Sequence, residues 1–132
     1  ALIAMAHQIP YVATASVANL RDLESKVMRA MEIGGSRYIH IHVPCPLGWG
    51  SVPGDTIKVA RLAVESGLFP LIEAENGEVT SHYRLRKPVP VGEYLRLQRR
   101  FAHLYGKNQD DETIAAIQAI ADRNIRRFGL LD

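Results

Sequence analysis

The only cysteine of the chain lies in a segment whose composition points to chemistry. Cys45 belongs to Pro44–Gly50, which contains two prolines and two glycines and follows Tyr38–Val43, the clearest strand pattern of the chain. The prolines restrict the backbone, and the glycines let it wrap closely around a ligand. Because open α/β sheets bind ligands beyond the carboxyl ends of their strands, a loop that holds Cys45 at a binding site is one possibility. Composition alone favours the other, a buried thiol that acts as a small hydrophobic group.

Two histidines on the preceding strand extend the possible chemistry of Cys45. His40 and His42 are two residues apart, so their side chains share one face of the strand. With Cys45 they form a His-x-His-x-x-Cys array that resembles the spacing of zinc ligands, and a Cys–His nucleophilic pair would use the same residues. We rank both possibilities low, because the proline turn carries Cys45 past the strand and a buried strand often holds a histidine bonded to backbone.

Three glutamates surround a predicted hairpin turn. Glu73 and Glu75 share one strand face, and Glu78 lies across the Asn76–Gly77 turn. Paired carboxylates can divide the roles of acid and base. At an exposed turn, however, charged side chains more often discourage pairing with further strands. We therefore expect a solvated edge and no catalysis there.

Positive charge is concentrated in one segment. Between Arg84 and Lys107 there are seven Lys or Arg residues and one Glu, a balance of +6, whereas the rest of the chain has nine basic and thirteen acidic residues, a balance of −4. Tyr94, Phe101 and Tyr105 interleave with these charges but fall on the apolar face of a predicted helix. We assign these aromatic residues to packing and the charges to a solvated or subunit-docking face, with no nucleic-acid partner.

The hydrophobic patterns alternate between strands and helices. Runs of apolar and β-branched residues predict four strands, at Tyr11–Ala15, Tyr38–Val43, Phe69–Glu75 and Glu78–Tyr83. The Asn76–Gly77 pair predicts a hairpin turn between the last two. Helical spacing with caps predicts helices that begin near Leu20, Thr56, Val91 and Asp110. The order indicates an α/β fold with a parallel sheet, an added antiparallel hairpin and two C-terminal helices.

Length and composition favour one α/β domain over residues 1–132, with residues 84–132 as a helical tail. The 132 residues are 47% hydrophobic, enough for a core without disulfides, and a single cysteine suits a reducing compartment, so we expect a cytoplasmic protein. The uncharged first 20 residues are too polar for a membrane span, and we expect no membrane partner. Because the chain starts within an apolar run, we interpret it as a fragment of something longer.

Five segments together resemble a known family: Ile3–His7, Ile9–Ser16, Tyr38–Trp49, Ala60–Leu71 and Lys87–Leu95. Their order and spacing are similar to the C-terminal part of the thiamine-diphosphate-binding beta subunit of 2-oxoacid:ferredoxin oxidoreductases, pyruvate synthase among them. The resemblance covers nearly the whole chain and is looser after Leu104. It implies the C-terminal portion of a thiamine-diphosphate-binding-type parallel sheet.

The resemblance also implies a function. The complete enzyme oxidatively decarboxylates a 2-oxoacid, by default pyruvate, to CO₂ and acyl-coenzyme A, and passes electrons through a 4Fe–4S cluster to ferredoxin. The complete subunit holds thiamine diphosphate, Mg²⁺ and the cluster, and its partners are the other subunits of the complex. The cysteine of the family's Pro-Cys loop is a cluster ligand, which here is Cys45.

Two family motifs are missing from this chain. Gly54-Asp55-Thr56 lacks the second glycine of the Gly-Asp-Gly magnesium motif, and the other cluster cysteines are absent. We therefore expect no catalytic residue in this chain, which alone binds neither cofactor and is inactive. The alternative function is a non-enzymatic interaction or assembly module that retains only the packing of the family.

Overall fold

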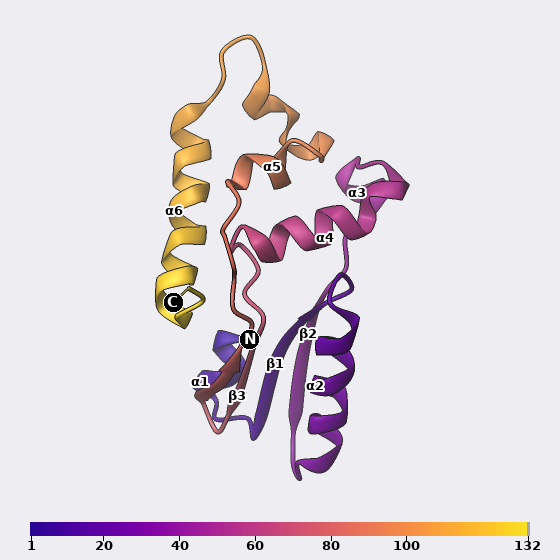
Figure 1. The fold of residues 1–132 in the computed structure, drawn as a ribbon, viewed down its shortest axis with the longest axis vertical. Coiled ribbons are helices and arrows are strands. Elements are labelled where there is room, and N and C mark those ends of the chain that lie inside the picture. Colours follow the sequence, from indigo (N-terminus) through magenta and orange to yellow (C-terminus); the bar gives the residue numbers. More distant parts are fainter. Residues whose placement is uncertain (132) are drawn as a thin grey trace.

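A computed structural model describes residues 1–131 of the chain. Figure 1 shows a sheet flanked by one long helix at one end of the molecule, and a group of helices at the other end. The sheet has the order β2-β1-β3-β4. Its strands are β1 (Tyr11–Ser16), β2 (Arg37–His42), β3 (Ile72–Glu75) and β4 (Glu78–His82).

Strand β1 is the centre of the sheet, as its unbroken apolar pattern predicts. All six of its residues are buried, and α1 (Leu2–Ala6) and α2 (Leu20–Glu32) cover it from opposite faces. Val12 packs with Ala4 of α1, whereas its neighbour Ala13 packs with Ala30 of α2. Because successive residues of a strand point to opposite faces, these two contacts place the helices on the two sides of the sheet.

Helix α2 is attached to the sheet by a buried lysine. The Lys26 Nζ donates a hydrogen bond to the Thr14 carbonyl oxygen at 2.9 Å and pairs with the Asp22 carboxylate at 2.8 Å. The helix begins at Leu20, as predicted, but the side chain of Asn19 at its N-cap position makes no capping hydrogen bond. Asp22 is occupied by Lys26 and therefore serves the attachment of α2 to β1.

The sheet is mixed, and this corrects the expectation of a parallel arrangement for the third strand. β1 and β2 run parallel, but β3 pairs with β1 in the antiparallel direction, with Tyr11 opposite Glu75. A parallel crossover requires a connection that travels back along the sheet. Helix α4 (Thr56–Glu65) instead lies across the end of the sheet (Figure 1), so the chain returns to the sheet at the end it left.

Thr14 of β1 forms hydrogen bonds with the segment in which the chain returns to the sheet. Its Oγ1 donates to the Pro70 carbonyl oxygen at 2.6 Å and accepts from the Ile72 N–H at 2.8 Å. These bonds start β3 at Ile72, three residues later than the sequence pattern predicts. The hairpin that follows is confirmed, with positive φ at Asn76 and Gly77, as a tight turn between β3 and β4 requires.

The remaining helices form the second half of the fold. They are α3 (Pro46–Trp49), α4, the 3₁₀ helix η1 (Pro53–Asp55), α5 (Val91–Leu95), the 3₁₀ helix η2 (Arg99–Tyr105) and α6 (Asp111–Phe128). Their main core cluster contains Val59, Ala63, Val91, Tyr94, Leu95, Leu104 and Ala121. Together with the sheet and its hairpin, these helices confirm the predicted α/β class with an added hairpin and C-terminal helices.

The single helix expected from Val91 to Tyr105 is divided in two. Gln98 adopts an extended backbone between α5 and η2, and its buried Nε2 donates to the Tyr94 carbonyl oxygen at 2.7 Å. This side-chain bond satisfies a carbonyl that a continuous helix would pair with a backbone N–H. The predicted start of the last helix near Asp110 is confirmed, and the Asp110 carboxylate caps it by accepting from the Thr113 N–H at 2.9 Å. Within residues 1–131, no helix combines the length and apolarity needed to cross a membrane.

Candidate functional site

The predicted Cys45 loop is a short, capped helix with an accessible thiol. Pro46–Trp49 forms α3, and Cys45 is its N-cap, with its Sγ accepting a hydrogen bond from the Gly48 N–H at 3.4 Å. The Trp49 N–H donates to the Cys45 carbonyl oxygen at 2.9 Å. Because the Cys45 side chain is exposed, the alternative of a buried, inert thiol is wrong. We call residues 45–50 the Cys45 turn.

The Cys45 turn ends in a position that requires glycine. Gly50 has φ of 66°, and a Cβ there would lie 2.7 Å from the Cβ of Arg99. The Arg99 N–H donates to the Gly50 carbonyl oxygen at 3.3 Å. The start of η2 therefore packs directly against the end of the turn, and the two segments are joined although they are far apart in sequence.

The two histidines belong to an aromatic cluster beside the turn. The His42 ring lies 4.9 Å from the Phe69 ring and 5.7 Å from the Trp49 ring, and the His40 ring lies 5.3 Å from Phe69. The Nδ1 of His42 is buried and has no hydrogen-bond partner among the described residues. Burial, helped by the nearby charges of Arg100 and His40, lowers the pKa of His42 to about 4.

Among residues 1–131 the structure gives no support to the two low-ranked possibilities that combined the histidines with Cys45. No group of three His, Cys, Asp or Glu residues within positions 1–131 is arranged to hold a metal ion. The hydrogen bond that Cys45 Sγ makes is to the Gly48 N–H, and His42 Nδ1 is unpaired, so no Cys–His pair is formed. The histidines face Phe69 instead, because both point to the same side of β2.

The depressed pKa of His42 predicts a stability that falls as the pH drops from about 6.5 toward 4. In this window the unfolded chain binds a proton that the folded chain does not, so the contribution of neutral His42 is complete above the window and lost through it. We expect a loss of about 1–2 kcal/mol, reduced by solvent at this half-buried ring. Urea unfolding of the wild type and of His42→Phe, which keeps an aromatic ring, measures it. Equal pH dependence of the two proteins would contradict the prediction.

Two of the three hairpin glutamates, Glu73 and Glu75, have structural partners. Glu73 accepts a 2.6 Å hydrogen bond from the Tyr11 hydroxyl, and burial together with this carboxylate raises the pKa of Tyr11. Glu75 pairs with Arg29 of α2 at 2.9 Å. The expected solvated edge is wrong for Glu73 and Glu75, because β3 is an interior strand and these side chains bond to β1 and α2, whereas Glu78 lies exposed on the edge strand β4.

One arginine of the basic segment is tied to the Cys45 turn. The Arg100 Cζ lies 4.0 Å from the centroid of the Trp49 ring and 4.7 Å from that of Phe101. Sequence patterns place Arg100 among solvated or docking charges and give no signal for this stack. The assignment of the aromatic residues to packing is confirmed, since Tyr94 is a core residue and Phe101 and Tyr105 pack against the same core.

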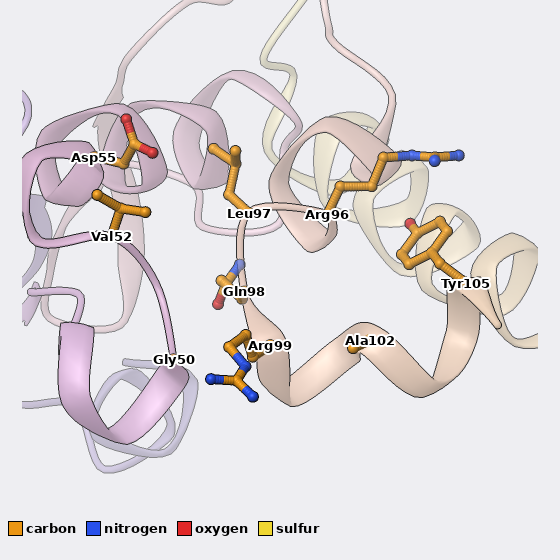
Figure 2. Close-up of a pocket in the computed structure, with 9 residues that line it drawn as sticks. All are labelled: Gly50, Val52, Asp55, Arg96, Leu97, Gln98, Arg99, Ala102 and Tyr105. Carbon is orange, nitrogen blue, oxygen red and sulfur yellow. The ribbon is translucent and has the colours of Figure 1, made fainter.

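A cavity of about 610 Å³ lies between the end of the Cys45 turn and η2. Gly50, Val52 and Asp55 line one side, and residues 96–99, Ala102 and Tyr105 line the other. Figure 2 shows that the guanidinium groups of Arg96 and Arg99 point in different directions, so they do not form a paired clamp for one anion. Arg96 lies over the Tyr105 ring, with its Cζ 4.3 Å from the ring centroid.

Comparisons with known proteins give consistent relatives, although no family model matches the chain. Pyruvate synthase subunit PorB of Methanosarcina barkeri is 50% identical over 125 residues, which cover 95% of this chain and 42% of that protein. Pyruvate synthase subunit PorB of Methanocaldococcus jannaschii is 45% identical over 129 residues, with coverages of 98% and 42%. Ketoisovalerate oxidoreductase subunit VorB of Pyrococcus furiosus is 40% identical over 114 residues, with coverages of 85% and 36%. The chain thus spans about two fifths of the length of these relatives.

These relatives are named as subunits of oxidoreductases. The pyruvate synthase subunits among them are 38–50% identical to this chain over most of its length. The chain belongs with the beta subunits of 2-oxoacid:ferredoxin oxidoreductases and corresponds to a C-terminal part of them. The resemblance inferred from the five sequence segments is thereby confirmed.

Proposed function

We propose that the chain is the part of a 2-oxoacid:ferredoxin oxidoreductase beta subunit that supplies one thiolate, Cys45, to a 4Fe–4S cluster. The observation that carries this proposal is the accessible thiol at the N-cap of α3, in a chain that is up to 50% identical to pyruvate synthase subunits. Pyruvate is the default substrate, since most of the relatives described are named for pyruvate synthase.

The residues of the Cys45 turn suit a cluster ligand. Cluster thiolates need an accessible sulfur, and N–H donors to that sulfur tune the reduction potential. Cys45 is exposed and accepts the Gly48 N–H, and Pro46 fixes the first residue of the helix behind it. Because the chain has one cysteine, the other ligands must come from outside these 132 residues.

The rest of the machinery is assigned to the remainder of the subunit. In the complete enzyme, thiamine diphosphate with Mg²⁺ supplies the decarboxylation chemistry, coenzyme A takes the acyl group, and the cluster carries electrons to ferredoxin. This chain contributes the fixed thiol, and the His42 ring packs on Trp49 within the Cys45 turn. We propose the other subunits of the complex as its partners and the cytoplasm, a reducing compartment, as its location.

A chimeric subunit tests the function. The C-terminal part of the Methanosarcina barkeri PorB subunit is replaced by this chain, and the complex is assembled with its other subunits under anaerobic conditions. We expect coenzyme A-dependent reduction of ferredoxin by pyruvate, within about tenfold of the parent complex, because the residues that hold the thiol are retained. A complex that assembles fully but reduces no ferredoxin with any 2-oxoacid would instead support the assembly module.

A further inference from the structure

Arg100 is held in one orientation by buried partners. Its Nε donates to the Gln98 Oε1 at 3.0 Å, and one terminal nitrogen lies 3.2 Å from the Tyr94 hydroxyl oxygen. Gln98 is 1% exposed and Tyr94 is 7% exposed, so both belong to the interior of the helical half. Such a fork of hydrogen bonds fixes the plane of a guanidinium, which a lysine ammonium cannot reproduce.

The fixed guanidinium plane packs on the tryptophan that ends α3. The Trp49 ring has Arg100 at 4.0 Å on its face, while the His42 ring lies 5.7 Å away. Helix α3 has only four residues, and so short a helix has no stability of its own. Its orientation therefore depends on tertiary contacts, which include the Arg100 stack, the packing of Trp49 against the helical core and the contact of Gly50 with Arg99.

Movement of Trp49 would be transmitted directly to Cys45. The Trp49 N–H is bonded to the Cys45 carbonyl oxygen, and the adjacent Gly48 N–H is bonded to Sγ. The charge of Arg100 also reaches the end of β2, since it contributes to the lowered pKa of His42. Arg100 thus acts on the geometry of the Cys45 turn through Trp49 and places a positive charge against the ring that ends this turn.

We propose that Arg100 is a positioning residue for Cys45: stacked on Trp49, it fixes the Cys45 turn, and its positive charge favours the reduced state of a cluster bound there. The second half of this proposal rests on the proposed function of Cys45. The first half concerns contacts within the described chain and stands without a cluster.

The chain offers a matched control. Arg96 also carries one positive charge and also stacks on an aromatic ring, that of Tyr105, but it does not contact Trp49. Arg100→Gln and Arg96→Gln therefore remove the same charge and the same kind of contact. Arg100→Lys keeps the charge and loses the planar fork.

The first test measures the turn without a cluster. Amide hydrogen exchange is followed in the full chain at Trp49 and Ser51, whose N–H groups donate to the carbonyls of Cys45 and Pro46. We expect exchange to accelerate about tenfold in Arg100→Gln, as local opening becomes easier, and to remain unchanged in Arg96→Gln. Emission of the only tryptophan, Trp49, should shift in the same variant. Equal exchange and emission in both variants would overturn the positioning role.

The second test measures the reduction potential of the cluster in the chimeric complex. We expect a more negative potential in Arg100→Gln than in Arg96→Gln, because a nearby positive charge stabilises the reduced cluster, and a potential closer to that of the wild type in Arg100→Lys. A shift in Arg100→Gln no larger than in Arg96→Gln would overturn the electrostatic role. If Cys45→Ser leaves the cluster intact, the proposed function fails, whereas the exchange result still decides the positioning of the turn.

Discussion

Replacing Cys45 by serine in the assembled chimeric complex is expected to remove most of its ferredoxin reduction by pyruvate. A serine oxygen is a poorer ligand for iron than a thiolate, and this chain has no second cysteine to take its place. We expect at least a tenfold loss of electron transfer, because losing even an outer-shell partner of a metal site costs about tenfold or more, together with a loss of iron and acid-labile sulfide. Iron content and the electron paramagnetic resonance signal of the reduced protein measure the effect.

Leu47→Ala is the matched control for this substitution. Leu47 lies in the same turn and is 95% exposed, so its truncation changes the surface of α3 without touching the sulfur. We expect iron content and electron transfer to remain at wild-type levels. If Cys45→Ser behaves like Leu47→Ala, Cys45 is not a ligand.

The second large effect concerns stability, at the glycine that ends α4. Gly67 has φ of 80°, and a Cβ there would lie 2.6 Å from the Cγ1 of Ile125 and 3.2 Å from the carbonyl oxygen of Ala121. The Asn124 Nδ2 also donates to the Gly67 carbonyl oxygen at 3.0 Å. We expect Gly67→Ala to lower the free energy of unfolding by about 3 kcal/mol, from left-handed strain together with overpacking against α6.

Gly34→Ala is the control for Gly67→Ala. Gly34 has no heavy atom within 4 Å of an added Cβ, and its φ is not positive. Its substitution should change stability by no more than about 0.5 kcal/mol. Urea unfolding followed by Trp49 fluorescence compares the two variants with the wild type. A similar change in both would contradict the tight contact between Gly67 and α6.

Sequence patterns correctly predicted the elements whose formation depends on residues that are close together in the sequence. The apolar run of β1, the Asn76–Gly77 hairpin turn and the helix start near Asp110 are confirmed because each depends on residues close in sequence. The direction of β3 did not follow from such signals. It depends on α4 lying across the end of the sheet and on the bonds that Thr14 makes 56 and 58 residues away.

The candidate site shows the same division. Two prolines and two glycines around Cys45 predicted a loop outside helix and sheet, but Pro46–Trp49 forms a short helix, because proline is tolerated at the first helical position. Composition placed Arg100 with the other charges of its segment, because its contact with Trp49 arises only when η2 meets α3. The spacing of His40, His42 and Cys45 was misleading, since the histidines face Phe69 while the chain turns away after Pro44.

The most direct test of Cys45 as a cluster ligand is the nuclear magnetic resonance spectrum of a complex labelled at Cys45 alone. Because this chain has a single cysteine, producing it with ¹³Cβ-cysteine and ligating it to the unlabelled preceding part of the subunit marks only that residue. In the reduced, cluster-bearing complex, the account predicts a ¹³Cβ resonance with a large paramagnetic shift, which arises through a direct iron–sulfur bond. A ¹³Cβ resonance at its ordinary diamagnetic position, in a complex that contains the cluster, would contradict the assignment of Cys45 as a ligand.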